Sequence, residues 1–157
     1  MQISLLCIGA TDEQEIVSLM QKYEKRLPAH FNFERVELQD IKNRKNRSEI
    51  EQKDLEAKML LDKIKPTDHV ILLDEKGKTF ASIEFANLLN QLFIASVSHI
   101  VFVVGGPYGF GAEMKKRANQ TMSLSAMTFT HQMVRLFFVE QLYRAYTILD
   151  GKPYHHV

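Results

Sequence analysis

Two short runs of uninterrupted apolar residues constrain the fold of this chain more than any other feature. Residues 69–73 (HVILL) and 99–104 (HIVFVV) are too short for typical helices, and a carboxylate or a glycine pair follows each. Strands that are apolar at consecutive positions are buried on both faces, which is typical of a parallel sheet covered by helices. The two runs therefore predict central strands of such a sheet.

The rest of the chain alternates between further strands and amphipathic segments. Residues 2–8 predict a buried strand that ends at Gly9, residues 31–39 a second strand, and residues 124–128 a short late strand, with Gly77 in a turn. The alternation predicts an α/β fold with a mostly parallel sheet flanked by helices. Ligands of such folds bind outside the carboxyl ends of the strands, here near Asp74, Gly105–Gly106 and Thr128.

Five helices are expected between these strands. Apolar residues at three-to-four spacing predict the first, which Thr11 or Asp12 can cap. Ser48–Glu51 fits a capping box that starts the second, and Ser82 can cap the third. The expected helices cover residues 16–27, 49–64, 83–95, 112–119 and 131–149, and Gly151 stops the last one.

Composition excludes several classes of protein. Hydrophobic residues make up 45% of the 157 residues, which is enough for one core, so we expect one domain over residues 1–157. The single cysteine, Cys7, excludes an internal disulfide and any zinc site built from cysteines. No apolar run is long enough to span a membrane, and the first residues do not resemble a signal peptide. A cytoplasmic protein without membrane or metal partners is expected.

The densest cluster of glycines lies at residues 105–111 (GGPYGFG). Ala112 and Glu113 occupy the positions where a Walker A loop needs Lys and Ser or Thr, so a triphosphate is not expected there. The dinucleotide pattern GxGxxG is also absent. The loop is therefore either a tight strand-to-helix turn or a site for a ligand that is not held by its phosphates.

Several motifs occur in an order that points to one family. They include residues 103–109 (VVGGPYG), 123–129 (SLSAMTF), 131–135 (HQMVR), 140–145 (EQLYRA) and the pair Tyr154–His155. Together with the chain length and the start ISLLCIG, they resemble the SPOUT-class ribosomal RNA large-subunit methyltransferase H family over essentially the whole chain. Each motif alone is weak, whereas their combined order is specific.

The resemblance implies an enzyme that uses S-adenosyl-L-methionine to methylate N3 of a pseudouridine in helix 69 of 23S rRNA, on the assembled ribosome. It also implies a homodimer with a C-terminal trefoil knot, a topology that composition and spacing cannot reveal. Without the resemblance, the apolar residues of the implied cofactor site are better explained as plain core. By motif position, that site comprises Leu73, Gly105, Leu124, Ser125, Ala126, Met127, Thr128 and Phe129.

Candidate catalytic residues lie in the last quarter of the chain. N3 of a pseudouridine must lose its proton, so a base, or a cation that stabilises the ring oxygen, is needed. Arg135 or Arg144 is expected to meet a phosphate or the ring oxygen, and Tyr154 and His155 to complete the site, in one version from the partner subunit. The base is unassigned among His131, Arg135, Arg144, Tyr154 and His155.

Structural alternatives remain for these residues. His131 can be a helix-start histidine bonded to backbone, and Arg144 can form a surface or dimer salt bridge. The last helix is apolar almost all round, which fits either a dimer interface or a central core helix. Residues 42–47 (KNRKNR) can contact RNA phosphates or form a solvated loop.

The leading hypothesis is therefore the rRNA methyltransferase. The second is a non-enzymatic ribosome- or RNA-binding factor that has kept the fold. The third is another transferase that uses the same cofactor on a different substrate.

Overall fold

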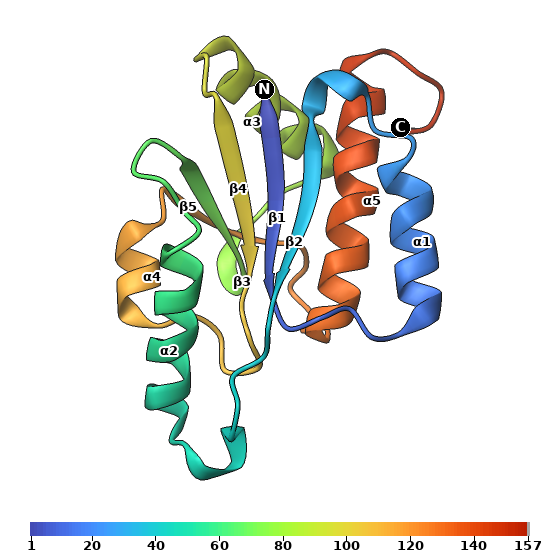
Figure 1. Cartoon of the computed structure of the whole chain (residues 1–157). Helices are drawn as coiled ribbons and strands as arrows, with labels where there is room; N and C mark the ends of the chain where they lie inside the picture. The colour runs from blue at the N-terminus through green and yellow to red at the C-terminus, as the bar shows by residue number, and fades with distance from the viewer. Residues whose placement is uncertain (157) are drawn as a thin grey trace.

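The computed structural model describes residues 1–156, so Val157, the last residue of the expected domain, lies outside the described residues. The described chain forms a five-stranded sheet with the order β2-β1-β4-β3-β5, in which each neighbouring pair is parallel (Figure 1). The parallel sheet predicted from the apolar runs is confirmed. Its strands are β1 (Gln2–Ile8), β2 (Phe33–Leu38), β3 (His69–Thr79), β4 (His99–Val104) and β5 (Gln120–Ser123).

Helices cover both faces of this sheet and give it two cores. Helices α1 (Gln14–Glu24), α3 (Ser82–Ile94) and α5 (His131–Leu149) pack on one face, with a core that contains Phe102 and Phe138. Helices α2 (Glu49–Leu61) and α4 (Ala112–Arg117) pack on the other face. Two single-turn helices, η1 (Ala29–Phe31) and η2 (Arg44–Asn46), complete the described elements.

The central strands supply both cores because their side chains alternate between the faces. In β4, Phe102 lies in the core under α3 and α5, whereas Val101 and Val103 lie in the core under α2 and α4. This is why these strands read as continuous apolar runs. None of the helices within residues 1–156 is both long enough and apolar enough to cross a membrane.

Of the three expected helix caps, one is confirmed and two are wrong. Ser48 and Glu51 form the predicted capping box of α2. The hydroxyl of Thr11 instead bonds to Glu37, and α1 begins after Glu13, to which no side chain of the described range gives a cap bond. Ser82 is already the first helical residue of α3, and its hydroxyl donates to Gln141 at 2.8 Å.

The late strand expected at residues 124–128 is misplaced. The structure puts β5 at Gln120–Ser123 and leaves residues 124–128 outside any strand. Local bonds explain the difference: Ser123 Oγ donates to the Ser125 carbonyl oxygen, and Ser125 Oγ accepts from the Met127 N–H. Such bonds give the backbone an alternative to a sheet ladder.

The expected end of the 69–73 strand is also wrong. β3 continues past Asp74 to Thr79, and its pairing with β5 shifts register between Leu73 and Lys78. Gly77 lies within this strand rather than in a simple turn. A Cβ at Gly77 would lie 2.6 Å from the backbone of Met122, so the close approach of β5 requires glycine there.

Candidate active site

A cavity of about 470 Å³ opens at the carboxyl ends of β4 and β5, beside residues 73–76 of β3. Three segments form its walls: residues 73–76 within β3, the glycine loop that follows β4, and the segment between β5 and α5. The place matches the rule that ligands of parallel sheets bind outside the carboxyl edge. The volume is within the range of small-molecule sites.

The structure brings most residues of the expected cofactor set to this cavity. Ala126, which is exposed, is absent from the lining within the described residues. Met127 borders the cavity with 72% of its surface exposed, so it lies at the rim rather than in an enclosed slot. The expected residues that line the cavity are Leu73, Gly105, Leu124, Ser125, Met127, Thr128 and Phe129.

The glycine loop forms a wall of the cavity through its backbone. Gly105 packs against the ring of Phe110, and a Cβ at Gly105 would lie 3.1 Å from that ring. Gly109 has φ +76°, a conformation that favours glycine. The loop can therefore bring peptide groups close to a ligand without side chains in between.

Charged residues that the sequence analysis did not assign to the cofactor also line the cavity. Asp74 and Glu75 follow Leu73, and Thr128 Oγ1 donates to Glu75 Oε2 at 2.5 Å. This bond ties the segment after β5 to β3. Their position at the end of an apolar strand is the sequence signal that could have identified them. Lys53, Lys76 and Lys115 complete the charged lining.

His131, the first residue of α5, is the one candidate catalytic residue that lines this cavity. Burial lowers the pKa of its imidazole, and the charges of Arg135 and Arg44 lower it further, whereas Asp40 and Asp12 oppose the shift. A lowered pKa keeps the ring neutral at neutral pH. The ring can then accept a proton.

Arg135 does not suit the role expected for it. Its side chain is fully buried. Nη2 donates to the Ile8 carbonyl oxygen at 2.6 Å and Nη1 donates to Thr11 Oγ1 at 2.9 Å. These bonds tie the first turn of α5 to the loop after β1, so in this protomer Arg135 holds the helix rather than meeting a substrate oxygen.

The remaining candidates form a separate cluster near the end of α5. Glu140 Oε1 accepts from Arg144 Nη2 at 2.6 Å and from the Tyr154 hydroxyl at 3.0 Å. The Arg144 guanidinium lies over the Tyr154 ring, 4.7 Å from its centroid, and Nη1 lies 3.4 Å from His155 Nδ1. Burial, with hydrogen bonds to Tyr23 and Glu140, raises the pKa of Tyr154, so its hydroxyl stays protonated.

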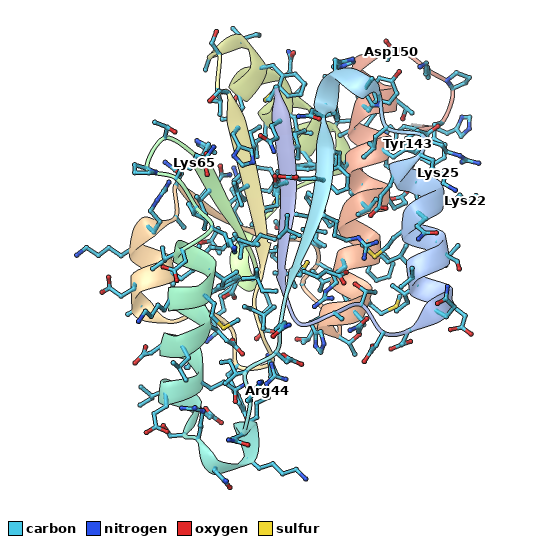
Figure 2. All side chains as sticks on the ribbon, in the orientation of Figure 1. Lys22, Lys25, Arg44, Lys65, Tyr143 and Asp150 are labelled. Carbon is cyan, nitrogen blue, oxygen red and sulfur yellow. The ribbon has the colours of Figure 1, made fainter. Side chains whose placement is uncertain are left out.

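This cluster and the cavity lie at opposite ends of α5. Thirteen residues separate His131 from Arg144, which corresponds to about 20 Å along a helix. Figure 1 shows α5 rising from the lower end of the sheet towards the C-terminus at the upper end. Figure 2 shows Tyr143, the neighbour of Arg144, beside α1 and far from Arg44. One protomer therefore does not bring Tyr154 and His155 to its own cavity.

A second cavity of about 320 Å³ adjoins the first. The two share the wall made by residues 123–125 and Phe129. Phe80, Phe85 and Phe137 line the second cavity, Phe85 from α3 and Phe137 from α5. The segment after β5 thus separates two hollows.

Comparison with known proteins identifies the class to which this site belongs. A family model described as "Predicted SPOUT methyltransferase" matches residues 1–155. Curated proteins named ribosomal RNA large subunit methyltransferase H match over 156 residues, which is 99% of this chain and 99% of each relative. The identity is 50% for the protein of Flavobacterium psychrophilum, 47% for that of Parabacteroides distasonis and 42% for that of Porphyromonas gingivalis W83.

The chain therefore belongs to the SPOUT methyltransferases, within the ribosomal RNA large subunit methyltransferase H family. This confirms the resemblance inferred from the motifs.

Two solved structures are more distant. One, described as a putative RNA methyltransferase of the TrmH family from Porphyromonas gingivalis, has a TM-score of 0.42 and 11% identity over 89% of this chain and 58% of its own. The other, the SpoU methyltransferase AviRb from Streptomyces viridochromogenes in complex with AdoMet, has a TM-score of 0.44 and 10% identity over 96% and 61%.

The residues at the cavity suit S-adenosylmethionine, the methyl donor of this enzyme class. Apolar side chains of Leu73, Leu124 and Phe129 can hold the adenine ring and the carbons next to the sulfonium. Peptide groups at Gly105–Gly106 and the hydroxyls of Ser125 and Thr128 offer hydrogen bonds to its polar edges. We propose that these residues hold the donor.

Proposed function

We propose that this protein methylates N3 of a pseudouridine in helix 69 of 23S rRNA on the assembled ribosome. The observation that carries the proposal is the 50% identity over essentially the full length to relatives named ribosomal RNA large subunit methyltransferase H. The cavity at the carboxyl edge of the sheet supports it because its volume and lining suit a nucleoside-bearing donor.

The proposal also covers the domain, the chain topology, the oligomeric state and the location of the protein. We infer a single domain over residues 1–157, a trefoil knot in its C-terminal part, a homodimer and a cytoplasmic location. The family assignment supports all four. The separation of Tyr154 and His155 from the cavity adds specific support for the homodimer, because only a second protomer could bring these side chains to the site.

The chain has two tasks in the reaction. S-adenosylmethionine, when bound, supplies an electrophilic methyl group on its sulfonium. The cavity walls orient the reactants, and a protein group must take the proton of N3 as the nitrogen attacks. His131 lines the cavity and its lowered pKa leaves it neutral, so we propose it as one candidate for the proton acceptor.

Tyr154 and His155 of one protomer would serve the target base at the other protomer's cavity. Arg144 holds the Tyr154 ring, and Glu140 binds both Arg144 and Tyr154, so the tail is braced before any substrate arrives. A cation such as Arg144 at that place could stabilise the developing charge on the ring oxygen. The two ends of α5 would then act in one composite site.

The test is methyl transfer to ribosomes that lack the mark. Purified protein, methyl-labelled donor and such ribosomes are incubated, and mass spectrometry locates the labelled nucleotide. Label on N3 of a pseudouridine in helix 69 supports the proposal. Label elsewhere would support another transferase. Binding to ribosomes with no label transfer, and with no heat when S-adenosylmethionine is titrated into the protein, would support the non-enzymatic factor.

The His155→Ala variant tests the role of the tail. We expect methyl transfer to fall at least about tenfold, because a group at the target is removed, while donor binding measured by calorimetry stays unchanged. His156→Ala, an exposed neighbour, is the matched control. Full activity of His155→Ala would remove this residue from the mechanism.

A further inference from the structure

A buried carboxylate on α2 lies directly behind the glycine loop of the cavity. The Glu56 side chain is 3% exposed, although glutamate is rarely buried. Oε1 accepts a hydrogen bond from Gln52 Nε2 at 3.2 Å, and Gln52 is buried one helical turn earlier. Oε2 is buried and has no hydrogen-bond partner among residues 1–156. Stability alone does not explain such a group, because a leucine would fill the same space at lower cost.

The carboxylate packs against Gly106, which itself lines the cavity. A Cβ at Gly106 would lie 2.7 Å from the Glu56 carboxyl carbon, closer than real side chains approach. A second glycine of the loop is similarly constrained, since a Cβ at Gly111 would lie 3.0 Å from the Lys53 carbonyl oxygen. Helix α2 therefore supports the glycine loop from behind at two points.

Arg44 connects the same carboxylate to the cationic segment 42–47. Its Nη2 lies 2.6 Å from Asp40 Oδ1 and 3.4 Å from Glu56 Oε1. Figure 2 shows Arg44 below the sheet, close to the lower end of α2. Burial raises the pKa of Glu56, and the charge of Asp40 adds to this shift. The Gln52 amide, the Arg44 guanidinium and the nearby backbone N–H of Gly106 oppose it. Arg44 thus acts as the counterion of a carboxylate that would otherwise be buried without an opposite charge.

We propose that Glu56 is a positioning residue that holds Gly105–Gly109 in the conformation competent for donor binding, and that Arg44 keeps its carboxylate in place. The inference rests on the proposed function in one respect, namely that the cavity binds S-adenosylmethionine. It assigns no contact between Glu56 and the donor, since Glu56 acts through the loop. It also gives Arg44 a different role from the exposed cations of its own segment.

The test is calorimetric binding of S-adenosylmethionine to purified variants, alongside their thermal midpoints. We expect Arg44→Gln and Glu56→Gln to weaken donor binding about tenfold, because the first removes the counterion of a buried carboxylate and the second removes the charge of that carboxylate. Lys45→Gln, an exposed position in the same segment, is the control and should bind like the wild type. A lower midpoint with unchanged donor affinity in both variants would show a purely structural role and overturn the proposal.

A second measurement uses the contact at Gly106. Gly106→Ala should weaken donor binding because the new Cβ collides with the carboxylate. In the background of Glu56→Ala, which weakens binding by itself, Gly106→Ala should cost little further affinity, since the shorter side chain makes room, so the two effects should not add. Additive effects would contradict the proposal. If the wild-type protein does not bind S-adenosylmethionine, both the proposed function and the role of Glu56 are excluded. If the wild type binds it and the variants bind it equally well, the role of Glu56 alone is excluded.

Discussion

Single residues at the start of α5 show how one helical turn separates two different roles. His131 lines the cavity, whereas Arg135, four residues later, is buried against the loop after β1. Residues four apart share a helix face, so their spacing alone predicts that both side chains meet the same site. The structure gives them different surroundings. The His131 imidazole borders the cavity, whereas the Arg135 guanidinium donates hydrogen bonds to the Ile8 carbonyl oxygen and to Thr11.

The pH dependence of methyl transfer should report the state of His131. The pKa of this histidine lies below its ordinary value of 6.5 in the folded protein, so the ring is neutral at pH 7 and becomes protonated only in more acidic solution. If it accepts the N3 proton, the rate falls as the pH drops through that lowered pKa. The measurement is the rate of methyl transfer from about pH 8 down to about pH 5.

The His131→Gln variant is the control for this profile. It keeps a polar side chain of similar size and removes the titrating ring. The acidic decline should disappear and the rate at neutral pH should fall. An unchanged decline in the variant would assign the titration to another group.

At the scale of elements, the approach of β5 to β3 shapes the cavity. β3 pairs with β5 before and after a register shift, and the residues between the two paired stretches include Asp74, Glu75 and Lys76 of the cavity wall. A regular ladder would have placed these side chains alternately on the two faces of the sheet. The irregularity therefore brings consecutive residues of β3 to the cavity wall.

The Gly77→Ala variant tests this arrangement. The new Cβ would lie 2.6 Å from the Met122 backbone, and backbone cannot move aside as the end of a flexible side chain can. We expect the free energy of unfolding to fall by about 3 kcal/mol, the upper part of the usual range for overpacking. Urea denaturation measures it, with the exposed Lys78→Ala as control. A decrease below about 0.5 kcal/mol, typical of surface substitutions, would contradict the close contact.

At the scale of the whole molecule, α5 links one candidate group at the cavity to three near its far end. A dimer in which the tail of each protomer reaches the other's cavity would unite them. An isologous interface provides two such composite sites, each built from both chains.

Mixing two inactive variants tests this arrangement. Gly105→Leu disables the cavity, because even a Cβ at Gly105 already meets the Phe110 ring, and His155→Ala disables the tail. Each homodimer should be inactive, yet a mixed dimer keeps one intact cavity facing one intact tail. After random exchange of subunits, about one quarter of wild-type activity should return. No recovery in confirmed mixed dimers would place the tail and the cavity of the same chain in one site.

The cationic segment 42–47 is a candidate contact between the whole molecule and a large RNA. Arg44 already pairs with Asp40 and Glu56, so three cations are the relevant ones. Replacing Lys42, Lys45 and Arg47 by Gln should weaken ribosome binding. It should also make the binding constant less dependent on salt: the slope of its logarithm against the logarithm of the salt concentration should become shallower by about 0.7–0.9 for each phosphate that is no longer neutralised. The measurement is ribosome affinity at several salt concentrations. An unchanged slope would make this segment a solvated loop.

Much of the fold and part of the site could be predicted from local sequence. The strands at residues 2–8 and 99–104 and the helix at 131–149 have the expected bounds, because their apolar patterns and stop signals are local. The misplaced late strand and the two wrong caps have a different origin. In all three cases a side-chain hydroxyl forms a hydrogen bond that the sequence pattern does not reveal. The hydroxyls are those of Ser125, Thr11 and Ser82.

By itself, the sequence determined the alternation of strands and helices, the parallel sheet, the family and, through the family's motifs, seven of the residues that line the cavity. These follow from periodicity and from motifs, which are properties of neighbours along the chain. Only the tertiary structure decided that Arg135 is buried, that Glu56 stands behind Gly106 and that Tyr154 and His155 lie far from His131. The reason is physical: the burial and partners of a side chain depend on segments that folding brings together from distant parts of the chain.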